Sequence, residues 1–141
     1  MNPITSISEL EKAFHIREVV FVQEQQCPIE DEFDEYDHLD AACFHILAYQ
    51  EGQPAGTGRV RFKEKTAKLE RICILKQFRG KGIGKDIVRT LEDIAHKQHA
   101  SEVVLHGQEH AEGFYHSLGY KTASDLFMED GIPHLLMKKS F

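Results

Sequence analysis

Apolar residues recur at helical spacing in two segments of the chain. The first segment begins after Ser8 and Glu11, which have the spacing of a capping box, and should end before Pro28. One face of this helix would carry Leu10, Ala13, Phe14, Arg17, Val20 and Phe21. The second segment follows Gly84, and its apolar positions are Ile87, Val88, Leu91, Ile94 and Ala95. The pattern therefore predicts two long amphipathic helices.

The remaining apolar runs are short and rich in β-branched residues, which is typical of strands. Residues 43–49, 57–62 and 67–75 predict a three-stranded meander, and residues 101–105 predict a strand after the second long helix. A shorter helix is expected at 111–118, and closing strands at 120–128 and 134–138. Residues 30–40 are crowded with acids, so we expect a solvated connection there.

Composition narrows the class of protein. The chain has 141 residues, of which 41% are hydrophobic, so we expect a single domain over residues 1–141. Lys and Arg number 17 against 23 Asp and Glu, for a net charge of −6, which argues against a nucleic-acid-binding surface and suits a cationic substrate. We see neither a signal peptide nor a membrane span, and expect a cytoplasmic location. Cys27, Cys43 and Cys73 form no C-x-x-C pair, so we expect neither a disulfide framework nor a zinc site.

A glycine-rich loop lies between the strand at 67–75 and the second long helix. It reads Arg79-Gly80-Lys81-Gly82-Ile83-Gly84, and the helix opens near Lys85. Glycines let backbone N–H groups approach a ligand closely, and a helix N-terminus favours negative charge, so the loop suits phosphate oxygens. A tight strand-to-helix turn without a ligand is the alternative. The positions of Lys85 and Asp86 disfavour both a P-loop and a dinucleotide-binding loop.

Two sequence patterns carry a family resemblance. The spacing of Arg79, Gly82 and Gly84 resembles the acetyl-coenzyme A pyrophosphate loop of the GNAT N-acetyltransferases, and residues 69–74 before it look like that family's fourth strand. About thirty residues later, Ala111, Phe114, Tyr115, Gly119 and Tyr120 repeat a second pattern of the family. Residues 20–25 with Pro28, and residues 131–134, resemble a subgroup of small bacterial GNAT proteins. The fold implied is α/β (α+β): a twisted, mixed, mostly antiparallel sheet of six to seven strands flanked by helices.

The resemblance implies acetyl-coenzyme A as cosubstrate, with no metal. Its binding residues would be Ile72, Cys73, Ile74, Arg79, Gly80, Lys81, Gly82, Ile83, Gly84, Lys85, Gln108, Phe114 and Tyr115. Gln108 departs from the family, which commonly has Asn at that position. Many relatives form homodimers, so a homodimer is one alternative for this chain.

The same resemblance assigns catalytic roles. A backbone N–H of Cys73 or Ile74 would polarise the thioester carbonyl, and Tyr115 would protonate the departing thiolate. Strand alternation puts Glu70 on the face of Ile72 and Ile74, where it would accept the ammonium proton through water; an ion pair with Arg61 or Arg71 is the alternative.

The sequence gives weaker evidence for the residues that would bind the acceptor. Candidates are Arg17, Glu24, Arg71, His110 and His134, and Arg17 would alternatively bind a buried carboxylate. His106, His110 and His116 do not share one helical face, so we expect no metal site from them. Cys73 is expected to be a packed thiol rather than a nucleophile.

These observations predict an enzyme that transfers an acetyl group to a primary amine of a small molecule, such as an amino sugar, polyamine or amino-acid derivative. No nucleic-acid or membrane partner is expected. A sensor or interaction module that binds acyl-coenzyme A without catalysis is the alternative.

Overall fold

The computed structural model describes residues 1–141 and contains one seven-stranded sheet. The strands are β1 (Cys43–Gln50), β2 (Gln53–Lys63), β3 (Thr66–Ile74), β4 (Glu102–Gln108), β5 (Lys121–Thr122), β6 (Phe127–Glu129) and β7 (Ile132–Ser140). They lie in the order β1-β2-β3-β4-β7-β5, and β6 also pairs with β7. All pairings are antiparallel except that of β3 with β4.

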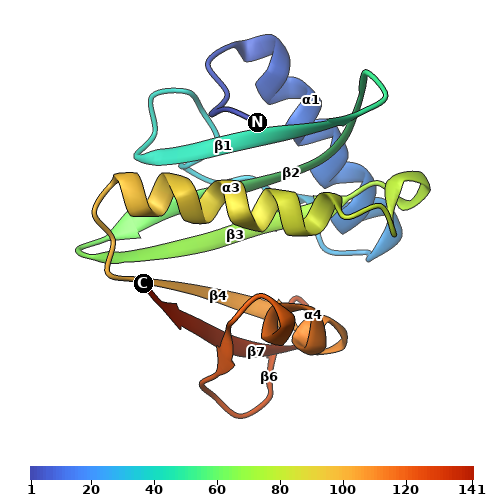
Figure 1. Cartoon of the computed structure of the whole chain (residues 1–141). Coiled ribbons are helices and arrows are strands. Elements are labelled where there is room, and N and C mark those ends of the chain that lie inside the picture. The colour runs from blue at the N-terminus through green and yellow to red at the C-terminus, as the bar shows by residue number, and fades with distance from the viewer.

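The helices cover the two faces of the sheet (Figure 1). They are α1 (Ile7–Arg17), the π-helical segment η1 (Glu18–Glu24), α2 (Ile29–Glu32), the 3-10 turn η2 (Lys76–Phe78), α3 (Ile83–Lys97), the 3-10 turn η3 (Glu109–Ala111) and α4 (Glu112–Ser117). Helix α3 connects β3 to β4 and lies across one face, with α1 behind the opposite face. The crossover through α3 returns the chain to the same end of the sheet, so β4 runs parallel to β3.

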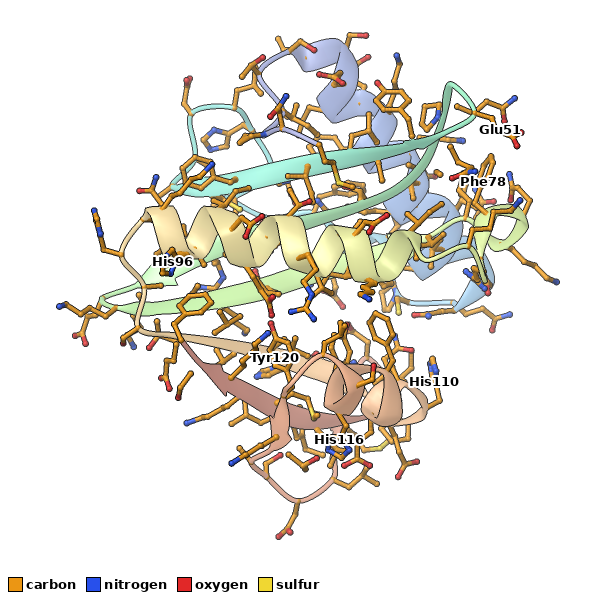
Figure 2. All side chains as sticks on the ribbon, in the orientation of Figure 1. Glu51, Phe78, His96, His110, His116 and Tyr120 are labelled. Carbon is orange, nitrogen blue, oxygen red and sulfur yellow. The ribbon has the colours of Figure 1, made fainter.

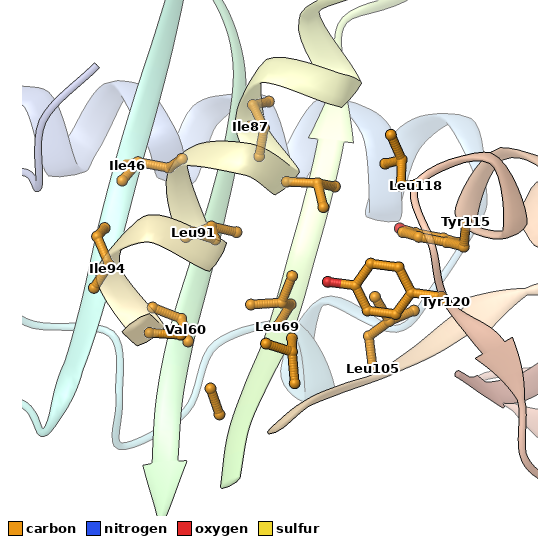
Figure 3. Packing of buried hydrophobic residues seen from close by; sticks show 14 of the residues in the cluster. Ile46, Val60, Leu69, Ile87, Leu91, Ile94, Leu105, Tyr115, Leu118 and Tyr120 are labelled. Atoms are coloured by element: carbon orange, nitrogen blue, oxygen red, sulfur yellow. The ribbon is translucent and has the colours of Figure 1, made fainter. Parts of the chain in front are cut away.

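The main core lies between α3 and the sheet. Ile87 and Leu91 of α3 face Val60 of β2 and Leu69 of β3, and all four are almost completely buried (Figure 3). A smaller cluster on the opposite face joins Ala13, Ile16 and Val20 to Leu47 and Cys73. Both long helices therefore bury the apolar stripes that their sequence spacing predicts.

The architecture confirms the predicted mixed, mostly antiparallel sheet, and corrects two local expectations. Ser6, not Ser8, caps α1, because its side chain accepts the hydrogen bond of the Glu9 N–H at 3.2 Å. The acidic stretch is not simply a solvated connection, since it begins within α2 and the Glu32 side chain is buried. No helix of the chain combines the length and the apolar character needed to cross a membrane.

Candidate functional site

A cavity of about 850 Å³ opens where β3 and β4 separate. The two strands pair only from Thr66 to Leu69 and from Glu102 to Leu105. Beyond these residues β3 stays paired with β2 and β4 stays paired with β7, so the two strands diverge (Figure 1). The backbone edges that face each other across this opening are therefore free to bind a ligand.

A β-bulge at Arg71 accompanies the separation. Between the pairs Thr57–Cys73 and Arg59–Glu70, β2 advances two residues while β3 advances three. Arg71 takes up the extra residue with a φ of +56°, in the left-handed region. A bulge bends its strand and raises the local twist, and here it does so where β3 leaves β4.

Backbone register selects one amide that faces the cavity. Leu75 N–H donates to the Ala55 carbonyl of β2 at 2.8 Å, and Cys73 lies opposite Thr57, so the polar groups of Ile74 point away from β2. The Ile74 carbonyl accepts instead from Arg79 Nε at 3.0 Å. Cys73 N–H faces β2, which corrects the expectation that either amide could polarise a carbonyl and leaves Ile74.

The bulge also changes the face on which Glu70 lies. Because one residue is added at Arg71, Glu70 does not share a face with Ile72 and Ile74, and the expectation from alternation was wrong. Glu70 accepts hydrogen bonds from Arg59 and Arg61, at 3.0 and 2.8 Å, and lies 3.3 Å from Lys68 Nζ. Burial alone would raise the Glu70 pKa, but the Arg61 hydrogen bond and the charges of Arg59, Arg61 and Lys68 lower it to about 2. A carboxylate with such a low pKa is a poor proton acceptor, which argues against Glu70 as the base.

The glycine loop leads into the N-terminus of α3 at one end of the cavity. Gly82 is the N-cap with a φ of +81°, no side chain caps the helix, and a Cβ at Gly82 would meet no protein atom within 4 Å. The first amides of α3 therefore face open space that a ligand can fill. Of the predicted loop residues, all but Lys81 line the cavity: Arg79, Gly80, Gly82, Ile83, Gly84 and Lys85.

Arg79 connects this loop to η1. Its guanidinium donates two hydrogen bonds of 2.7 Å to the Glu24 carboxylate. Glu24, which the sequence suggested for the acceptor, thus lies at the loop end of the cavity. A bidentate pair of this kind orients Arg79 beside the α3 N-terminus.

Tyr115 of α4 reaches into the cavity beside β4. Its ring packs on Gly107, where an added Cβ would come within 3.2 Å of it, and stacks edge-on with Phe114 and Tyr120. Figure 3 shows the ring extending from α4 toward β3. Tyr115 is only 8% exposed, lines the cavity, and has no protein hydrogen-bond partner for its hydroxyl. Desolvation raises the pKa of Tyr115 to about 12, which keeps the phenol protonated.

Gln108 bridges the two sides of the cavity. Its amide donates to Gln25 Oε1 at 3.0 Å, and its own Oε1 accepts from His110 Nε2 at 2.7 Å. His110 lies in η3 beside α4 (Figure 2) and lines the cavity. The sequence pointed to Gln108 and His110 but not to Gln25, which no local pattern distinguishes.

Arg17 does not reach the cavity, which corrects its assignment to the acceptor. It is 1% exposed and donates to Glu32 at 2.9 Å and to Asp37 at 2.5 Å. The alternative, that Arg17 binds buried carboxylates, is therefore the observed one. Arg71 does line the cavity and lies 3.3 Å from Glu32, so the acidic stretch is fixed beside the bulge.

His134 of β7 also lines the cavity, and two residues that the sequence did not select accompany it. His134 Nδ1 donates to the Ile132 carbonyl at 2.7 Å, and its Nε2 lies 3.6 Å from Glu129 Oε2. His106 Nδ1 donates to the other Glu129 oxygen at 3.0 Å. The hairpin of β6 and β7 creates this cluster, and only its three-dimensional register reveals it.

Comparison with known proteins gives a family match over most of the chain. The model of the acetyltransferase (GNAT) domain matches residues 16–141. A Bacillus subtilis protein provisionally named an acetyltransferase is 59% identical over 139 residues, covering 99% of this chain and 95% of its own length. YjcF, an uncharacterized N-acetyltransferase of the same organism, is 44% identical and covers 93% of this chain and 92% of its own length.

Solved structures agree with this match. An acyl-CoA N-acyltransferase from Pseudomonas aeruginosa superposes with a TM-score of 0.84 at 27% identity, covering 96% of this chain and 93% of its own. An aminoglycoside 6'-N-acetyltransferase complexed with coenzyme A has a TM-score of 0.80 at 13% identity, covering 99% of this chain and 95% of its own, and shows a shared fold.

Proposed function

The chain belongs to the GNAT acetyltransferase family, and we propose that this acetyl-CoA-dependent N-acetyltransferase acetylates a primary amine of a small molecule. One observation carries the proposal: a single cavity is lined by the N-terminus of α3, by Tyr115 and by His134. A phosphate site, a proton donor and space for an acceptor are thus connected.

The loop end suits the diphosphate of coenzyme A. The free amides at the start of α3 are donors for phosphate oxygens, and Arg79 and Lys85 add positive charge. Ile72 and Ile74 line the next part of the cavity on β3, and Phe114 lies across from them on α4. We assign these residues to cosubstrate binding.

The central part of the cavity suits thioester chemistry. Ile74 N–H, which the register turns toward the cavity, is placed to donate to the carbonyl oxygen as negative charge develops there. The Tyr115 phenol, which its raised pKa keeps protonated, is placed to give its proton to the departing sulfur. An amine would attack the carbonyl directly while both substrates are bound.

The cysteines support direct attack rather than an acetylated enzyme. Cys73 is 6% exposed within the α1 cluster, and desolvation raises its pKa. Desolvation also raises the pKa of Cys27, the other cysteine at the cavity. Neither thiol is activated as a nucleophile, because activation requires a lowered pKa or an adjacent base.

The acceptor end carries acidic groups. Asp31, Glu129 and Asp130 line it, while the buried Glu32 is paired with Arg17 and Arg71. An acidic wall attracts cationic amines, in keeping with the net charge of −6. We therefore favour a polyamine, an amino sugar or an amino-acid derivative.

A direct assay tests this function. Thiol release from acetyl-coenzyme A is measured with spermidine, glucosamine and lysine amide as acceptors, and the acetylated product is identified by mass spectrometry. We expect acceptor-dependent release with at least one of the three. Tight binding of coenzyme A without such release would instead support a sensor that binds acyl-coenzyme A.

A further inference from the structure

The part of the cavity proposed for the acceptor contains a cluster of two imidazoles and a carboxylate. This cluster consists of His106, Glu129 and His134, all of which line the cavity. Glu70 is ion-paired with Arg59, Arg61 and Lys68, so a different group must accept the proton of the acceptor's ammonium. A base is needed because only the neutral amine is a nucleophile.

Hydrogen bonding determines which His134 nitrogen is free. The Ile132 carbonyl can only accept, so the 2.7 Å contact places the proton of the neutral ring on Nδ1. Nε2 is then left with its lone pair. Phe127 stacks on the imidazole, with ring centroids 6.1 Å apart and planes inclined by 25°, and holds the ring in this orientation.

Glu129 lies beside the free nitrogen of this ring. Its Oε2 lies 3.6 Å from Nε2, and its Oε1 is held by the His106 Nδ1–H at 3.0 Å. A carboxylate beside a newly protonated nitrogen stabilises the imidazolium. His134 is 6% exposed, whereas the Glu129 side chain is 42% exposed and stays in contact with water.

We propose that His134 is the catalytic base that removes a proton from the acceptor's ammonium, with Glu129 and His106 as positioning residues. The inference rests on the proposed function. Tyr115 and His134 approach the cavity from opposite faces of β4, since Tyr115 packs on Gly107 and His134 pairs with Gln108. Acid and base are thus separated, as a reaction that needs both requires.

The protons balance. Nε2 takes one proton from the ammonium, and the freed nitrogen lone pair forms the N–C bond. As the C–S bond breaks, sulfur keeps the electron pair and receives the Tyr115 proton. Tyr115 regains a proton from the nitrogen of the new amide, and His134 releases its proton to water. One proton is released per acetyl group transferred.

Other charged side chains line the same cavity as His134. They are the carboxylates of Glu24, Asp31, Glu32, Glu70, Glu129 and Asp130, the cations of Lys68, Arg71, Arg79 and Lys85, and the imidazoles of His106 and His110.

The test compares His134→Gln with wild type on the best acceptor of the three amines, from pH 7 to pH 10. We expect kcat/KM to fall about 10²-fold at pH 7, and the deficit to shrink to less than about 3-fold at pH 10, where much of the amine is already neutral. Glu129→Gln should show the same trend with a smaller deficit.

Controls separate the base role from other effects. His116→Gln is the matched control, because His116 is exposed on α4 and contacts Thr122 outside the cavity (Figure 2). The melting temperature and the coenzyme A affinity of His134→Gln should match those of wild type. A deficit equal at all pH values, or none at all, would overturn the base role. A wild-type enzyme that acetylates none of the amines would overturn the proposed function and this inference together.

Discussion

Two ionisable residues at this cavity show how local environment decides chemistry. Tyr115 and Glu70 are both largely withdrawn from water, and desolvation is the largest single influence on the pKa of each, but only for Glu70 do neighbouring cations together outweigh it. Arginine and lysine side chains surround Glu70 and hold its negative charge. Burial therefore leaves one group a protonated donor and the other a permanently ionised structural anion.

Replacing Tyr115 by Phe tests the donor role. We expect kcat to fall about 10²-fold while the dissociation constant for coenzyme A stays unchanged, because only the hydroxyl is removed. Thiol-release kinetics and calorimetric titration measure the two quantities. An unchanged kcat would exclude Tyr115 as the proton donor.

The lowered pKa of Glu70 predicts acid sensitivity. Its folded-state pKa of about 2 lies below the ordinary value of 4.5, so its contribution to stability is present above pH 4.5 and is lost as the pH falls toward 2. Urea unfolding across this range should show a declining free energy of unfolding.

The Glu70→Gln variant supplies the control for this decline. The free energy of unfolding of Glu70→Gln should fall less steeply with decreasing pH than that of wild type. At pH 7 the variant should be less stable than wild type by about 2–4 kcal/mol, because Arg59 and Arg61 lose their shared partner. Parallel pH profiles for the two proteins would contradict the assignment.

Sequence reasoning located residues in short local patterns better than residues joined across the fold. The loop residues and Tyr115 lie in compact motifs, and all of them except Lys81 line the cavity. Gln25, His106 and Glu129 were missed because each acquires its partner from a distant element. Arg17 was misassigned for the same reason, since its partners Glu32 and Asp37 come from the acidic stretch.

At the scale of elements, the bulge at Arg71 has the largest consequences. It places Glu70 and Ile72 on opposite faces of β3 at the point where β3 separates from β4. The left-handed conformation of Arg71 costs energy for any residue with a Cβ, and most for a β-branched one.

A pair of substitutions isolates this backbone cost. Arg71→Gly and Arg71→Val both lose the contact with Glu32, but only glycine accepts the left-handed backbone without strain. We expect the free energy of unfolding of Arg71→Val to be about 1–2 kcal/mol lower than that of Arg71→Gly. Equal stabilities in chemical denaturation would show that the bulge is not retained.

The glycine loop allows a similarly matched comparison. Gly82 and Gly52 both have a left-handed backbone with no protein atom within 4 Å of an added Cβ, but only Gly82 borders the cavity. Alanine at either site should lower stability by about 1 kcal/mol. Only Gly82→Ala should weaken coenzyme A binding, by about tenfold or more in calorimetry, and an unchanged affinity would remove the loop from the binding site.

The order of the elements followed from the sequence, but their register did not. Periodicity predicted both long helices and the meander, and the glycine pattern predicted the loop between β3 and α3. A bulge adds a single residue and leaves the apolar pattern almost intact, so the face of Glu70 was predicted wrongly. The short α2 helix was missed because its residues, Ile29–Glu32, are mostly acidic and its burial depends on Arg17.

For the whole molecule, the proposed function makes one geometric claim. The sheet separates between β3 and β4, and under this proposal the opening binds acetyl-coenzyme A with its diphosphate at the start of α3 and its thioester between Ile74 and Tyr115. The acceptor would reach the thioester beside Glu129 and His134, which line the same cavity. A single cavity would then accommodate both substrates in a chain of 141 residues.

A crystal structure of the protein with coenzyme A tests this claim most directly. We predict that the amides of residues 83–85 donate to the diphosphate oxygens, and that the coenzyme thiol lies within hydrogen-bonding reach of the Tyr115 hydroxyl. A cofactor bound elsewhere, or a diphosphate that makes no contact with the start of α3, would contradict it.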